Sequence, residues 1–150
     1  MLYPIIRPKG GDFLYTDDEY EIMLHDVKLC KQSGCDGIVI GLLNEDGTID
    51  MKRTAALVDI AYPMGVTFHR AFDRCRNAFE ALEQLVQIGC ERILTSGQQP
   101  TVNEGMELIA ELNKNSRPSD HYNAGQWRTK ENIKLLAEKT GCKEFHFLFT

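Results

Sequence analysis

Apolar and polar positions along the first quarter of the chain describe a helix followed by a buried strand. Residues 17–33 place most of their apolar side chains on one helical face, and residues 37–41, GIVIG, form a short run that is apolar on both sides. Thr16 and Glu19 have the types and spacing of a capping box, and Gly34 is suited to end the helix. A strand without polar alternation is buried on both faces, as in a parallel sheet.

The same order of helix, glycine and strand recurs three more times. The predicted helices cover about residues 50–62, 77–88 and 129–140, they end near Gly65, Gly89 and Gly141, and the strands that follow are VTFHR, RILTSG and EFHFLF. The strands that begin near positions 37, 66 and 92 are separated by somewhat less than about 30 residues, the length of one βα unit. The predicted fold class is therefore α/β with a parallel sheet, either an open doubly wound sheet or a (βα) barrel.

Polar residues at the ends of the predicted strands favour the barrel. Any one of them could be a loop cap, but the carboxyl ends of all strands in a parallel barrel converge on one face, where the active site lies. These strand-end residues are Arg7, Asp12, Gly41, Asn44, His69, Arg70, Asp73, Thr95, Ser96 and His146.

Composition narrows the class of protein. A chain of 150 residues with 43% hydrophobic and 26% charged residues is typical of one soluble globular domain. A net charge of −5 and a pI near 5.4 argue against a nucleic-acid binder and against attachment to anionic membranes. The start, MLYPIIRPKGG, has no signal-peptide core, and no apolar run reaches the roughly 20 residues that span a bilayer. Five cysteines without CxxC spacing are predicted to be reduced cytosolic thiols.

Five segments together resemble the CutC copper homeostasis family in order and spacing. They are IIRPKGGDFLYTDDE, CDGIVIGLLNEDGTID, VTFHRAFD, ERILTSG and KEFHF, and the resemblance covers nearly the whole chain except about residues 113–128. It implies a TIM-type (βα) barrel that handles copper, can bind cuprous ion (Cu⁺) and has no settled enzymatic reaction. It also implies a cytoplasmic protein, with the nucleus as a further location, that tends to form homo-oligomers.

The departures from the family pattern predict an incomplete barrel. The resemblance places two further strands before Tyr3, and these carry the cysteines usually suggested as copper ligands. Residues 113–128 are too polar for an interior strand, so strand seven is expected to be absent and His121 to lie in a loop. We therefore expect one domain over residues 1–150, truncated at its N-terminus, with open sheet edges and marginal stability. A vestigial isoform without activity is one alternative.

The strand-end residues also suggest a second function, an enzyme that acts on a small anionic metabolite. Arginine binds carboxylate or phosphate in a bidentate fork, and histidine transfers protons near neutral pH. The catalytic candidates are His69, Arg70, Asp73 and His146, and the substrate-binding candidates are Arg7, Asp12, Thr95, Ser96 and Gly97. The competing interpretation is structural, with Arg7 paired to Asp12 and Arg70 paired to Asp73. Whether the chain is an enzyme stays open.

Cuprous ion prefers thiolate and thioether ligands and accepts imidazole. Cys75, near His69 on the predicted active face, is a weak candidate ligand. The other cysteines are interpreted as apolar filler: Cys30 on the apolar helix face, and Cys35, Cys90 and Cys142 after helix-ending glycines at the strand starts. The leading prediction is a copper homeostasis protein that binds Cu⁺ in the cytosol.

Overall fold

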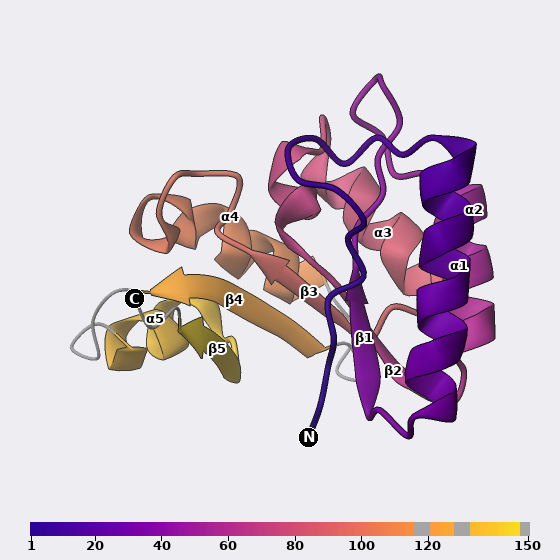
Figure 1. Cartoon of the computed structure of the whole chain (residues 1–150). Helices are drawn as coiled ribbons and strands as arrows, with labels where there is room; N and C mark the ends of the chain where they lie inside the picture. The colour runs from indigo at the N-terminus through magenta and orange to yellow at the C-terminus, as the bar shows by residue number, and fades with distance from the viewer. Residues whose placement is uncertain (116–120, 128–132, 148–150) are drawn as a thin grey trace.

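The computed structural model describes residues 1–115, 121–127 and 133–147. For residues 121–127, 133, 146 and 147 it describes the backbone alone. Its centre is one parallel sheet whose strands follow chain order, β1-β2-β3-β4-β5 (Figure 1). The strands are β1 Gly37–Ile40, β2 Gly65–Phe68, β3 Arg92–Thr95, β4 His121–Trp127 and β5 Glu144–Phe147. Every neighbouring pair is parallel. The predicted α/β class with parallel strands is confirmed.

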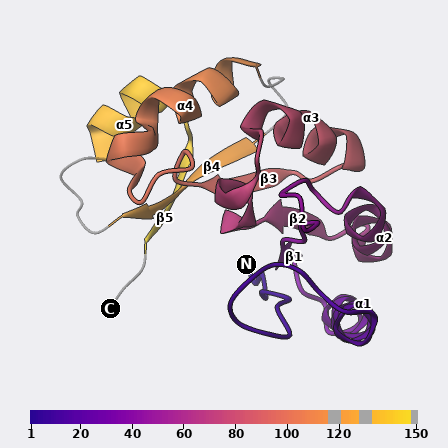
Figure 2. The same ribbon diagram turned by 90° about the horizontal axis from the view of Figure 1, so that it is seen from above.

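The helices cover the outer side of a curved sheet. They are α1 Asp17–Gln32, α2 Met51–Ala61, α3 Ala78–Ile88, α4 Val102–Asn115 and α5 Ile133–Thr140, with a 3-10 helix, η1, at Arg70–Arg74. Seen from above, the strands form an arc and the helices follow its convex side from α1 round to α5 (Figure 2). This arrangement is an incomplete (βα) barrel, as predicted.

The N-terminal segment extends the arc beyond β1. Ile5 forms a parallel bridge to Val39, the Ile6 amide donates to the Val39 carbonyl at 2.8 Å, and the Val39 amide donates to the Pro4 carbonyl at 2.9 Å. The segment therefore occupies a strand position without the length of a regular strand. It brings Arg7 to the same end of the sheet as the carboxyl ends of β1 and β2.

Most local signals of the sequence act as predicted. Thr16 and Glu19 form the capping box of α1, and Gly34, Gly89 and Gly141 have the positive φ angles that end helices. The end of α2 differs, because the helix stops at Ala61 and Gly65 already belongs to β2. Pro63 explains the difference, since the residue before a proline is disfavoured in helical geometry.

The expectation that strand seven is absent is wrong. His121–Trp127 forms β4, which pairs in parallel with β3 on one side and β5 on the other. Both neighbours offer a free backbone edge, and a strand held on both sides depends on its context more than on side-chain propensity. The sequence analysis did not predict α4, which begins at Val102. Its first turn is held by the Glu104 side chain, which accepts a hydrogen bond from the Thr101 amide at 3.1 Å.

Three apolar clusters hold the helices on the sheet, and the smallest of them joins α4 to α5 around Ile109 and Leu136. Of the two larger clusters, one joins α3 and η1 to β2 and β3 around Phe68, Phe72 and Leu85, and the other joins α1 and α2 to β1 around Met23, Ile38 and Leu57. In the described part of the chain, no helix combines the length and the apolar character needed to cross a membrane.

Candidate functional site

The carboxyl end of β2 presents a buried histidine. His69 follows Phe68 directly and caps η1, because its Nδ1 accepts a hydrogen bond from the Ala71 amide at 3.1 Å. Its ring lies 4.9 Å from the Phe13 ring, centroid to centroid. A Cβ added to Gly41, at the end of β1, would overlap the imidazole, so the glycine makes the space that the ring fills. His69 is 5% exposed.

The hydrogen bond to Nδ1 determines what the other nitrogen of His69 can do. Burial first, and the nearby Arg7 charge second, lower the pKa of His69 to about 4, so the imidazole is neutral at physiological pH. A neutral imidazole that accepts at Nδ1 carries its proton on Nε2. This Nε2–H is buried and has no hydrogen-bond partner in the described structure. His69 therefore offers an unused donor, suited to an oxygen atom of a ligand and poorly suited to a metal ion.

Arg7 lies near His69, and Tyr15 lies near Arg7. The Arg7 guanidinium stacks over the Phe13 ring at 4.8 Å and donates to the Gly11 carbonyl at 3.0 Å. The hydroxyl of Tyr15 is buried without a hydrogen-bond partner in the described structure. Burial raises the pKa of this phenol, and the Arg7 charge opposes the rise. We call these residues, Arg7, Phe13, Tyr15 and His69, the Arg7–His69 corner.

The predicted alternative that Arg7 pairs with Asp12 is not what the structure has. Asp12 forms an ion pair with Lys9 at 3.4 Å and accepts from the Leu14 amide at 3.3 Å. The guanidinium of Arg7 is left exposed at the corner, with its positive charge close to the unused donor of His69.

Asp73 contrasts with His69, because donors of the protein itself surround its carboxylate. Arg70 Nε donates at 2.8 Å and Thr95 Oγ1 at 2.5 Å. The Ser96 amide and hydroxyl donate at 3.0 Å each, and the Gln98 amide at 3.1 Å. The pairing of Arg70 with Asp73 is the structural arrangement that the sequence left open. The hydrogen bonds from Thr95, Ser96 and Gln98 to the same carboxylate fix the loop after β3 to η1.

The TSG loop after β3 does bind an anion, but that anion is the side chain of Asp73. The amides of Ser96 and Gln98, which a bound phosphate could use, point at this carboxylate. Gly97 lies against the backbone of Gly105 in α4, where a Cβ would clash. Thr95, Ser96 and Gly97 therefore hold the loop to η1 and α4, and their donors are already used.

The remaining candidates are spread over the same end of the sheet. Asn44 donates to Thr48 Oγ1 at 2.9 Å within its own turn. The backbone of His146 lies in β5, and its side chain falls outside the described residues. Cys75 is 6% exposed, and burial, reinforced by Asp73, raises the pKa of its thiol to about 12.

Among the side chains that the structure describes, no group of three or more His, Cys, Asp or Glu residues is arranged to hold a metal ion. All five cysteines are free thiols. A copper site built from the described residues would therefore have at most two of these side chains as ligands.

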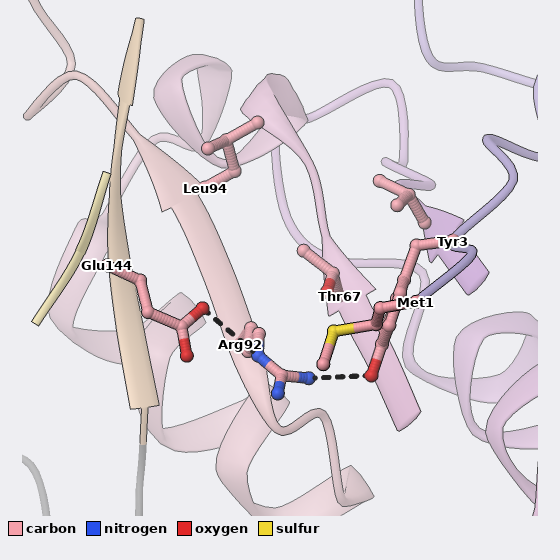
Figure 3. A pocket seen from close by; sticks show the side chains of 7 residues that line it. Met1, Tyr3, Thr67, Arg92, Leu94 and Glu144 are labelled. Atoms are coloured by element: carbon pink, nitrogen blue, oxygen red, sulfur yellow. Dashed lines mark hydrogen bonds and ion pairs between the residues drawn. The ribbon is translucent and has the colours of Figure 1, made fainter. Parts of the chain in front are cut away.

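The concave side of the sheet contains a separate cavity of about 290 Å³ toward the strand starts (Figure 3). Arg92 crosses it, donating to the Tyr3 hydroxyl at 3.2 Å and forming an ion pair with Glu144 at 3.4 Å. Sequence reasoning named neither Arg92 nor Tyr15, because both become notable only through contacts between segments far apart in the chain.

Comparisons with known proteins agree on one family. The family model described as the CutC family matches residues 1–150. A protein named family protein CutC from Parabacteroides distasonis is 49% identical over 142 residues, which are 95% of this chain and 58% of that protein. A protein of the same name from Vibrio vulnificus is 48% identical over 147 residues, covering 97% of this chain and 59% of that protein. The chain thus spans a little under three fifths of these curated relatives.

The fold also matches a solved structure. The crystal structure of a protein described as a copper homeostasis protein, CutC, from Streptococcus agalactiae superposes with a TM-score of 0.91 at 28% sequence identity. The match covers 98% of this chain and 72% of that chain.

Proposed function

Since this chain belongs to the CutC family, we propose that it acts in copper homeostasis by binding Cu⁺ in the cytosol. The observation that carries the proposal is the family match along the whole chain, together with the description of the Streptococcus agalactiae relative as a copper homeostasis protein. Five free thiols support it, because soft sulfur ligands favour Cu⁺.

Cys75 and His69 are weak ligands for this ion. Copper would have to displace the proton of a thiol whose pKa is raised to about 12. It would also have to displace the proton from His69 Nε2, since Nδ1 is engaged with the Ala71 amide. Copper binding by the chain is therefore proposed to depend on thiols other than Cys75.

The test is a titration of the reduced, purified chain with Cu⁺ against a competing cuprous chelator, with circular dichroism of the same sample. We expect tight uptake of about one Cu⁺ by a folded chain, and the same uptake by the Cys75→Ala variant. A chain with native α/β dichroism that takes up no copper would contradict the proposal.

A second candidate function, the binding of a small anionic molecule, is favoured by one specific observation. At the Arg7–His69 corner an exposed guanidinium lies beside a neutral imidazole whose Nε2–H has no partner in the described structure. A carboxylate or phosphate oxygen would complete that hydrogen bond and neutralise the Arg7 charge. Proton transfer by His69 to such a ligand is the enzymatic form of this proposal.

The anion proposal is tested with inorganic phosphate and acetate as probes in thermal unfolding. Either anion should raise the Tm of the chain if it binds the folded state. Arg7→Met should abolish that rise, whereas Arg76→Met, which removes an exposed arginine bound to Asp46, should keep it. Equal responses from both variants would contradict binding at the corner.

A further inference from the structure

The turn that ends α1 brings two cysteines together. Gly34 has φ +74°, its amide donates to the Lys31 carbonyl at 3.2 Å, and the Cys35 amide donates to the Cys30 carbonyl at 3.1 Å. These two bonds define a Schellman motif. The side chains of the two residues that share its longer loop commonly touch, and here those two residues are Cys30 and Cys35.

Both thiols are partly accessible. Cys30 and Cys35 are free and half-buried, and Cys30 packs with its inner side against the core beneath α1. The sulfhydryls are close enough to interact: burial raises the pKa of Cys30 most, and the charge and hydrogen bonding of the Cys35 thiol raise it further. Cys30 thus packs against the core, as predicted, and it also lies beside the partly exposed Cys35.

We propose that Cys30 and Cys35 together form a two-thiolate binding site for Cu⁺. The site rests on the copper role proposed above and names the ligands for it. It lies at the strand starts, at the end of the sheet opposite the Arg7–His69 corner.

The chemistry of the pair suits this ion. Cu⁺ is a soft cation that selects thiolates, and two sulfur ligands satisfy it without a third residue. Each thiol releases its proton to solvent as its copper–sulfur bond forms, and no electron is transferred. The site then changes from neutral to one net negative charge. Lys31, in the last turn of α1, supplies a nearby positive charge.

The chain contains a matched control for the turn. At the end of α3, Gly89 has φ +96°, its amide donates to the Val86 carbonyl at 3.1 Å, and the Cys90 amide donates to the Leu85 carbonyl at 3.0 Å. The motif is the same, but the partner of Cys90 is a leucine. Cys90→Ala therefore removes one thiol from an identical turn that has no dithiol.

The experiment is a Cu⁺ titration of the full chain against a competing chelator, with Cys30→Ala/Cys35→Ala, each single variant and Cys90→Ala. The double variant should bind Cu⁺ at least about 100-fold more weakly, because loss of mere outer-shell partners already costs up to that factor. Cys90→Ala should bind like the unaltered chain. Bound Cu⁺ should also protect Cys30 and Cys35, but not Cys90, from alkylation mapped by mass spectrometry.

The outcomes separate this site from the copper role itself. Uptake by the unaltered chain together with unchanged affinity in the double variant would overturn the dithiol site and leave the copper role standing. No uptake by a folded, unaltered chain would overturn both. Circular dichroism of every variant excludes loss of the fold as the cause, and alkylation protection of the unaltered chain tests the ligands without any substitution.

Discussion

His69 and Asp73 lie one short 3-10 turn apart at the end of β2, yet their surroundings are opposite. Five donors of the protein surround the carboxylate of Asp73, whereas His69 keeps a buried Nε2–H without a partner in the described structure. A polar residue at a strand end can thus be structural or available, and its residue type alone does not say which. The difference supports the proposal that an anionic ligand binds on the side of His69 and Arg7.

The largest loss of stability is expected when the hydrogen bonds to the Asp73 carboxylate are removed. Asp73→Ala leaves Arg70 and the amides of the loop after β3 without their acceptor, and should lower the free energy of unfolding by about 3–5 kcal/mol. Urea denaturation measures the loss, and Asp59→Ala on the exposed side of α2 serves as the control. If Asp73→Ala costs no more than Asp59→Ala, the network does not stabilise the fold.

His69, whose Nε2–H is available, makes the stability of the fold depend on pH. The folded-state pKa of His69 is about 4 and the unfolded value is 6.5, so the unfolded chain binds more protons between these values. The contribution of neutral His69 to the free energy of unfolding is therefore fully present above pH 6.5. It is lost as the pH drops toward 4, and the total loss is about 3 kcal/mol.

Unfolding free energies of the chain and of His69→Asn, compared at pH 7 and pH 4.5, measure this term. Asparagine keeps an acceptor for the Ala71 amide but does not titrate, so the variant should lose less stability on acidification. Parallel pH profiles of the two proteins would show that His69 titrates normally.

The space that Gly41 makes for His69 can be tested next. Gly41→Ala forces a methyl group into the imidazole and should cost about 1–3 kcal/mol of stability. Gly10→Ala is the control, because no atom lies within 4 Å of a Cβ added there. Gly41→Ala in a His69→Ala background should cost less, since the overlap with the imidazole is gone and only the close approach to the Ala71 Cβ, at 2.9 Å, stays. An equal cost in both backgrounds would locate the strain elsewhere.

The smallest effect is a difference in the rate of thiol labelling, and it concerns Cys75, which follows η1. This experiment does not change the stability of the fold. Its thiol is buried and has a pKa raised to about 12, so little of it is the reactive thiolate at neutral pH. Iodoacetamide should modify the half-exposed Cys30 and Cys35 well before Cys75, as measured by peptide mass spectrometry over time. Early labelling of Cys75 would mean that the region around η1 opens readily.

Much of the fold could be predicted from local signals. The capping box at Thr16 and the helix-ending glycines at 34, 89 and 141 act within a few residues of the chain, so the sequence reveals them directly. β4 could not be predicted in this way. Its strand structure comes from the two neighbours that pair with its backbone. Its sequence lacks the alternation of apolar and polar residues from which a strand is predicted.

The site was predictable by location but not by role. The strand-end rule brought Arg7, His69 and Asp73 to one end of the sheet. Whether each donor or acceptor is free depends on contacts between segments, such as the Ser96 amide that faces Asp73. The dithiol differs again: glycine at position 34 implies the turn, and the turn implies the contact of Cys30 with Cys35, so the signal was present in the sequence.

Arg92 has a consequence for how the chain folds. Its guanidinium joins Tyr3 in the first segment to Glu144 in the last strand, across the concave face of the sheet. The Tyr3 contact alone spans 89 positions of the chain. Contacts of such long range close large loops and are reached slowly, so the two contacts of Arg92 form only after the local βα units have formed. This bridge across the concave face is thus a late event of folding, and unfolding is expected to begin by breaking it.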